Sequence, residues 1–224
     1  MTTFVALLRA VNVSGQNRIP MAELRRVLGG LGLTGVETYL QSGNAVFDAK
    51  DDEPAGSSAQ KLATAIEVRI ERDLGPRVGA LVVTADDFAR VVGANPFVGA
   101  ADIDEQWLHA TFLLGSAAES DFGAASEAAF SAVYAAAFGK LPLPAEAGER
   151  AAFVGSPALA VPVVYLYLPH GYGRTKLSNG YFERSLGAAA TTRNWRTVLA
   201  LAGMSARGHE PRETGRTAHH EPST

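Results

Sequence analysis

The first 85 residues switch between two hydrophobic periods, and the order of those periods restricts the fold more than any other feature of the chain. Two segments with an apolar residue every three or four positions, 21–31 and 62–74, predict amphipathic helices. Short apolar runs of strand length lie around them, at 4–8, 36–40, 45–47 and 78–83. The order β-α-β-β-α-β predicts a ferredoxin-like arrangement, an antiparallel sheet with both helices on one face.

The following part of the chain begins with the same succession of elements. Strands are predicted at 107–114, 151–154 and 163–168, and an alanine-rich helix with a stripe from Phe122 to Ala137 separates the first two. We therefore expect an α+β protein with two ferredoxin-like (α-β plait) subdomains in tandem, at 1–88 and 89–204.

Two further helices are predicted near 177–186 and 192–202. In the second helix Trp195, Val198, Leu199 and Ala202 recur at helical spacing, so this stripe should face the sheet and Trp195 should anchor the core. The segment 205–224 has no apolar period and is rich in Arg, Glu, Gly, Pro and His, which predicts a disordered tail.

Composition excludes several classes of protein. The absence of cysteine excludes disulfides, thiolate metal sites and a cysteine nucleophile. The histidines show no metal-binding spacing, so no metal or other cofactor is predicted. No apolar run reaches the ~18 residues that a membrane helix needs. The N-terminus lacks the basic segment and cleavage site of a secretory signal, so we expect a cytoplasmic protein with no membrane partner.

Charge is distributed unevenly along the chain. The net charge of −3 argues against a dedicated DNA-binding protein. However, the formal charges of residues 9–26 sum to +3 and those of residues 170–196 sum to +4. Because the charges of the tail from residue 205 balance, the remaining residues sum to −10. Two interpretations remain open: the cations cover solvated helix faces, or both stretches line one surface that attracts anions.

Five short segments carry most of the polar residues that stand beside glycines or strand ends. They read LLRAVNV at 7–13, YLQSGN at 39–44, NPF at 95–97, YGRTKL at 172–177 and TTRNW at 191–195. Together they resemble the DUF1697 family, although Ala10 and Ser14 stand where that family commonly has glycine. The resemblance implies two ferredoxin-like subdomains and no particular activity.

The polar residues of these segments are mostly hydrogen-bond donors, and carboxylates are nearly absent. Some follow the first predicted strand or form a hairpin tip, and others are expected to open the last two helices, where unpaired N–H groups favour anions. We take the following as candidate binding residues, with no catalytic residue assigned: Arg9, Asn12, Gln41, Ser42, Asn44, Arg174, Lys176, Thr192, Arg193 and Asn194.

Each of these residues also has a structural explanation, such as turn chemistry, a helix cap or an ion pair between the two halves. The leading hypothesis is that the protein binds a phosphorylated or otherwise anionic small molecule, or a nucleotide, in a basic cleft between the subdomains. A nucleic-acid-binding protein is one alternative. The other is an enzyme that uses His170 or Tyr172 as acid or base, with Arg174 and Lys176 as electrostatic stabilisers.

Overall fold

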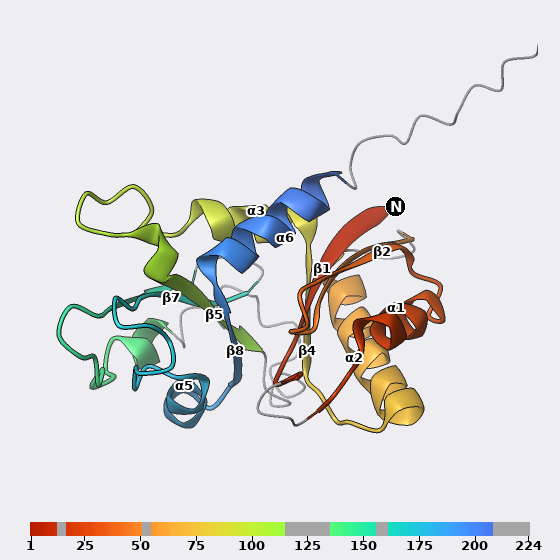
Figure 1. The fold of residues 1–224 in the computed structure, drawn as a ribbon, viewed down its shortest axis with the longest axis horizontal. Coiled ribbons are helices and arrows are strands. Elements are labelled where there is room, and N and C mark those ends of the chain that lie inside the picture. Colours follow the sequence, from red (N-terminus) through yellow and green to blue (C-terminus); the bar gives the residue numbers. More distant parts are fainter. Residues whose placement is uncertain (13–16, 51–54, 115–134, 156–160, 208–224) are drawn as a thin grey trace, which may run out of the picture.

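The computed structural model describes residues 1–12, 17–50, 55–114, 135–155 and 161–207, and Figure 1 labels most of its elements. The first half of the chain contains β1 (Thr2–Leu8), α1 (Met21–Gly29), β2 (Thr34–Tyr39), β3 (Asn44–Ala49), α2 (Ala55–Leu74), β4 (Ala80–Thr84) and α3 (Ala85–Gly93). The second half contains a 3-10 turn (Glu105–Trp107), β5 (Leu108–Leu114), β6 (Arg150–Val154), β7 (Val163–Tyr167), α5 (Asn179–Leu186), β8 (Ala189–Asn194) and α6 (Trp195–Arg207).

The strands form two antiparallel sheets with one topology. The order is β2-β3-β1-β4 in the first sheet and β6-β7-β5-β8 in the second, so each sheet has its first strand between its third and fourth. This is the ferredoxin-like order, which occurs twice in the chain. The prediction of two tandem ferredoxin-like units is confirmed.

The helix predicted near 192–202 is wrong at its start, because residues 189–194 form the edge strand β8. The two threonines of this segment favour the extended backbone, and β8 pairs with β5 over its whole length. Helix α6 begins only at Trp195. It then continues to Arg207, past the predicted start of the tail at residue 205, and Ser205 is buried.

Helices α1 and α2 cover one face of the first sheet, as the sequence predicts. Leu24 of α1 and Ile66 of α2 pack against Phe4 and Phe47, whose rings lie 6.0 Å apart. The corresponding face of the second sheet packs Leu113 and other apolar residues against α5.

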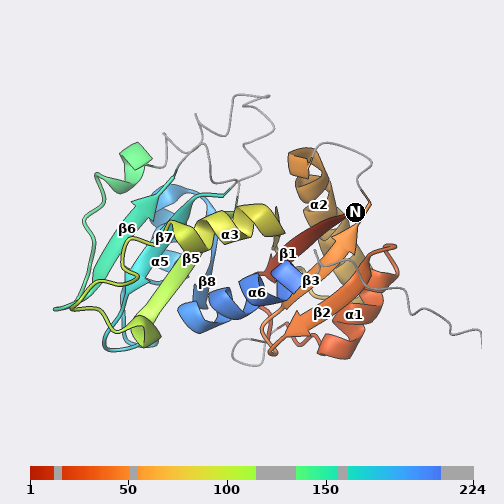
Figure 2. The same cartoon turned by 90° about the horizontal axis from the view of Figure 1, so that it is seen from above.

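Helices α3 and α6 lie side by side between the two sheets, an arrangement that the sequence analysis did not anticipate (Figure 2). One apolar core joins Val5 and Leu7 of the first sheet with Phe112 and Tyr165 of the second. Because these residues share a core, the two subdomains are packed as one body. The expected boundary at residue 88 falls inside α3.

Trp195 belongs to this shared core and is only 2% exposed, so its predicted role as a core anchor is confirmed. Its ring meets the Tyr165 ring edge to face at 6.2 Å, and the Tyr165 hydroxyl donates to the Val91 carbonyl oxygen of α3. Leu199 was predicted in the same buried stripe but is 44% exposed, because α6 presents Val198 and Leu201 to the core.

Two predictions concern residues outside the described part of the chain. The alanine-rich helix falls mostly within 115–134, and only residues 135–138 at its end are described, as helical. Residues 208–224 of the predicted tail also lie outside the description. In the described residues, no helix is long and apolar enough to cross a membrane.

Candidate functional site

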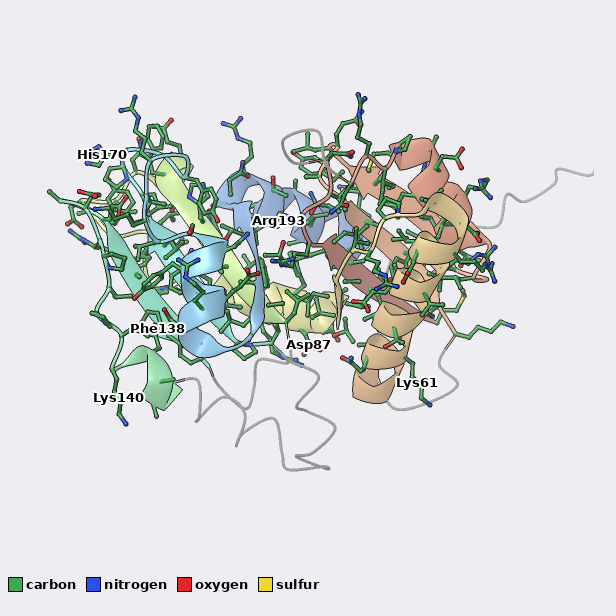
Figure 3. The ribbon with its side chains drawn as sticks, turned by 90° about the horizontal axis from the view of Figure 1, so that it is seen from below. Lys61, Asp87, Phe138, Lys140, His170 and Arg193 are labelled. Carbon is green, nitrogen blue, oxygen red and sulfur yellow. The ribbon has the colours of Figure 1, made fainter. Side chains whose placement is uncertain are left out.

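Arg193 lies on β8 at the junction between the two subdomains, and its side chain points into the space between them (Figure 3). The residue is 9% exposed. All five N–H groups of its guanidinium have acceptors. These acceptors are Asn44 Oδ1 at 2.5 Å, the carbonyl oxygens of Leu8 at 2.7 Å, Thr192 at 3.0 Å and Ser42 at 3.3 Å, and Thr191 Oγ1 at 2.7 Å.

No carboxylate of the described residues is paired with Arg193, so its acceptors are all neutral. Burial lowers the pKa of Arg193 to about 10, because removing the cation from water disfavours the charged form. Arg193 is still protonated at neutral pH. The junction therefore holds a positive charge that its hydrogen bonds solvate but do not neutralise.

The loop after β1 and the β2–β3 turn are held together by Asn12. Its Nδ2 donates to the carbonyl oxygens of Ile19 at 3.0 Å and Gln41 at 2.7 Å, and its Oδ1 accepts from Ile19 N at 2.9 Å. Asn44 joins the same region, because its Nδ2 donates to Ser42 Oγ at 2.8 Å while its Oδ1 accepts from Arg193. Each asparagine thus fixes the path of one connection near the junction.

Backbone strain is concentrated in these two connections. The non-glycine residues with positive φ in the described chain are Ala10 (55°), Asn12 (54°), Asn17 (49°) and Leu40 (56°). Gly43, at φ 71°, has no room for a side chain, since a Cβ there would lie 2.8 Å from Leu8 Cβ. Strain of this kind is retained where the surrounding structure enforces it, which is common at functional sites.

Arg9 leaves the end of β1 and forms a bidentate ion pair with Glu183 of α5, with Nε–Oε1 at 2.7 Å and Nη2–Oε2 at 2.9 Å. The hydrogen bond that Arg9 donates to the Glu183 carboxylate raises the pKa of Arg9. Burial pushes the pKa of Glu183 upward, but hydrogen bonds from Arg9 and from Ala190 N outweigh it, so the net shift is downward. Arg9 Nη1 makes no hydrogen bond within the described residues, and the side chain is 39% exposed.

Six of the ten candidate residues therefore gather at the junction. We call this set the junction site: Arg9, Asn12, Gln41, Ser42, Asn44 and Arg193. The carbonyl oxygens of Leu8 and Ser42 accept from the same nitrogen of Arg193, which brings the Arg9 segment and the hairpin tip together. The exposed Gln41 side chain makes no hydrogen bond within the described residues, and Ser42 is half-buried.

The side chains of the other four candidates have other partners or none, although the Thr192 carbonyl oxygen accepts from Arg193. Thr192 Oγ1 donates to Asn179 Oδ1 at 2.5 Å, and Asn194 Oδ1 caps α6 by accepting from Thr197 N. Lys176 forms an ion pair with Glu146 at 3.0 Å. The exposed Arg174 side chain contacts no partner in the described part of the chain.

The expected helix N-termini at Arg174 and Arg193 are wrong. Arg174 and Lys176 lie in the loop before α5, which begins at Asn179 after the capping residue Ser178. Arg193 lies inside β8. Both segments contain threonine and polar residues that suit a strand or a turn as well as a cap, so their composition did not distinguish these possibilities.

Of the two residues that the enzyme hypothesis uses as acid or base, His170 lies far from the junction site and Tyr172 is hydrogen-bonded within the protein. His170 lies in Figure 3 at the outer end of the second subdomain, far from Arg193, and its Nε2 contacts the Ala147 carbonyl oxygen at 3.1 Å. The Tyr172 hydroxyl donates to Thr192 Oγ1 at 3.3 Å and accepts from Asn179 N at 3.1 Å.

The nucleic-acid alternative would use an open sheet face, which is how many ferredoxin-like domains bind RNA. In this chain one face of the central strands β1 and β3 packs against α1 and α2. The opposite face is also buried, since Val5, Leu7 and Val46 lie in the core that contains α3 and α6. No stacking surface is open on these two strands.

Two residues of this region were missed in the sequence. Glu183 was counted only in the charge balance, although it is the one carboxylate within the basic stretch 170–196. Asn179, which follows the capping residue Ser178 at the start of α5, was not singled out in the sequence. The spacing of Glu183 from Arg9, 174 residues along the chain, gives no local signal of their contact.

Comparison with known proteins identifies the family and the fold of the chain. The family described as "Protein of unknown function (DUF1697)" matches residues 1–139, which is more than half of the chain, so the protein belongs to this family. A solved structure, described as the conserved bacterial protein SP0830 from Streptococcus pneumoniae, is similar in fold with a TM-score of 0.60 at 22% identity. The similarity covers 91% of this chain and 98% of that one. Among curated proteins, none matches significantly.

Proposed function

We propose that this member of the DUF1697 family is a binding protein for a small anionic ligand, such as a phosphorylated metabolite or a nucleotide, which it holds at the junction site. The observation that carries this proposal is the buried Arg193 guanidinium without a carboxylate partner. Burial of a charge costs free energy unless an opposite charge lies close. An anion at the rim of the junction would reduce that cost, so its binding and the stability of the fold are coupled.

The rim also offers donors for direct contact. Arg9 keeps its Nη1 group free of the Glu183 pair, and the Ser42 hydroxyl, which accepts from Asn44, can still donate its own proton. The Gln41 amide is exposed and has no partner in the described chain. A guanidinium with a hydroxyl and an amide is a suitable donor set for phosphate or carboxylate oxygens.

The test measures the melting temperature of the full chain with inorganic phosphate, with AMP and with adenosine. We expect phosphate and AMP to raise it, and adenosine to leave it unchanged. At a ligand concentration of 100 times Kd, binding contributes about 2.7 kcal/mol, a shift of several degrees. Sodium chloride should reduce the shift, because part of the attraction is electrostatic.

Two variants assign any shift to the junction. Gln41→Ala removes an exposed amide that has no partner, and the double variant Arg9→Gln, Glu183→Gln removes the ion pair without changing the net charge. The matched control is Arg77→Gln, Glu71→Gln, an exposed pair elsewhere on the surface. Equal stabilisation of the junction double variant and the control by phosphate would reject the proposal, as would equal effects of AMP and adenosine on the wild type.

A further inference from the structure

The two repeats carry different residues at equivalent positions of their sheets. Thr84 and Asn194 each end the fourth strand and precede the following helix, and their register partners are Phe4 and His109. The same register makes Ala6 the counterpart of Thr111, and Val82 the counterpart of Thr192. The first sheet is thus apolar where the second sheet places a histidine and two threonines on one face.

His109 is 8% exposed and is oriented by two contacts. Its Nδ1 lies 3.1 Å from the Trp107 carbonyl oxygen, so Nδ1 carries the proton and Nε2 the lone pair in the neutral ring. The imidazole stacks on the Tyr172 ring, with centroids 5.5 Å apart and planes inclined by 27°. Nε2 makes no hydrogen bond within the described residues, and it belongs to a residue that keeps 8% of its surface exposed.

A directed chain of hydrogen bonds lies beside the imidazole. Thr192 Oγ1 donates to Asn179 Oδ1 at 2.5 Å, and therefore it accepts from Thr111 Oγ1 at 2.8 Å and from the Tyr172 hydroxyl at 3.3 Å. This chain fixes the Asn179 amide with its oxygen toward the protein. Asn179 Nδ2 has no acceptor within the described residues, and Asn179 is partly exposed.

We propose that these five residues (His109, Thr111, Tyr172, Asn179 and Thr192) form a second site, the His109 site, which binds a hydroxyl compound. His109 Nε2 accepts the proton of the ligand hydroxyl, and Asn179 Nδ2 donates to an oxygen of the same ligand. A fixed acceptor beside a fixed amide donor and an aromatic ring is the arrangement that recognises an alcohol or a sugar hydroxyl. This site is separate from the junction site, since Thr192 and Arg193 point to opposite faces of β8.

Burial lowers the pKa of His109, and the hydrogen bond to the Trp107 carbonyl offsets this only in part. Tyr172 is the titratable side chain packed on the ring, and Asn194 is the neutral cross-strand neighbour. The imidazole is therefore neutral at pH 7 and available as a base or nucleophile.

The first test uses p-nitrophenyl acetate as a probe of the neutral imidazole. Nε2 attacks the acyl carbon, the C–O bond breaks with release of p-nitrophenolate, and water then hydrolyses the acetylimidazole to acetate and a proton. We expect release that is half-maximal below pH 6.5, the ordinary pKa of histidine. The other four histidines contribute a background rate. His109→Gln should therefore lower the rate severalfold more than His170→Gln does. A folded His109→Gln variant with the wild-type rate would overturn the proposal.

A second test needs no variant and identifies the ligand class. Diethyl pyrocarbonate should carbethoxylate His109 in the native wild-type protein, as read by mass spectrometry of its peptides. Ribose and glycerol should protect His109 but not His170, whereas acetate and inorganic phosphate should protect neither. An unmodified His109 beside a modified His170 would overturn the reactive imidazole. Modification without protection by either hydroxyl probe would overturn the hydroxyl ligand.

Discussion

The two repeats share one topology, yet they differ in the strand that faces the other repeat. By the register that relates Thr84 to Asn194, Arg193 of β8 is the counterpart of Val83 of β4. Val83 is 3% exposed and packs in the shared apolar core. Arg193 instead crosses the junction to acceptors on the first repeat. The fold tolerates an apolar residue at this position, so the arginine reflects a requirement of the junction and not of the sheet.

The helices that follow the fourth strands differ in the same way. Helix α3 begins with the small Ala85, and α6 begins with Trp195 at the equivalent position. Trp195 contributes a large ring to the core that the two sheets share, which the small Ala85 side chain cannot do. The second repeat thus provides both the largest apolar anchor and the buried cation of the interface between the repeats.

Replacing Trp195 by alanine, the residue at the counterpart position, should have the largest effect on stability. The free energy of unfolding should fall by roughly 3–5 kcal/mol, because a large buried side chain leaves a cavity against Tyr165. Urea unfolding measures this. Leu199→Ala on the exposed side of the same helix is the control and should cost less than about 0.5 kcal/mol. A folded Trp195→Ala variant of wild-type stability would mean that the sheets close over the lost volume.

Arg193→Met should have the next largest effect, a loss of about 2–4 kcal/mol. Methionine removes the cost of the buried charge, but it leaves the Asn44, Leu8 and Ser42 oxygens without their donor. Arg196→Met, at an exposed arginine of α6, should leave the urea midpoint nearly unchanged. If Arg193→Met proved more stable than the wild type, the charge itself would be the dominant cost, as it is for some buried ion pairs.

Thr192→Val gives β8 the residue type that Val82 provides in β4, and should cost about 1–2 kcal/mol. The Tyr172 hydroxyl and Thr111 Oγ1 lose an acceptor, and Asn179 Oδ1 loses a donor. The same substitution at the exposed Thr34 of β2 controls for strand propensity and should stay within about 0.5 kcal/mol. Equal urea midpoints for the two variants would show that the polar cluster contributes nothing net to stability.

The sequence predicted the part of the fold that depends on local periodicity. The runs that became β1, β3, α1 and α2 show clear strand or helix periods, and the first repeat followed from them. Strand β8 (AATTRN) has no such signal, because its stability comes from pairing with β5, about 80 residues earlier in the chain. The position of α3 and α6 between the sheets is likewise a long-range result of packing two apolar faces.

The candidate site was predicted only in part, because the contacts that complete it are also long-range. Arg9, Asn44 and Arg193 were selected by residue type, and the structure gathers them at the junction. The partners that define their chemistry are backbone carbonyl oxygens and Glu183, which residue type and spacing do not identify. His109 lies in the predicted strand 107–114 and was not taken as a candidate. The available signal was Thr111, two residues later on the same face of an otherwise apolar strand.

The smallest expected effect is a difference in stability between variants of two glutamates, one in each repeat, that each accept a backbone hydrogen bond from an edge strand. Glu67 of α2 accepts from Ala80 N of β4 at 2.7 Å, and Glu183 of α5 accepts from Ala190 N of β8 at 2.9 Å. A glutamine at either position can still accept the backbone hydrogen bond, so Glu67→Gln should leave stability nearly unchanged. Glu183→Gln also loses the ion pair with Arg9 and should cost up to about 1 kcal/mol at pH 7. Because the fold lowers the pKa of Glu183, this contribution is present above its ordinary pKa and is lost as pH falls through the lowered value. The difference between wild type and Glu183→Gln in urea midpoints should therefore shrink in acid. A difference that stays constant from pH 7 into acid would show that Glu183 acts through its acceptor oxygen alone, as Glu67 does.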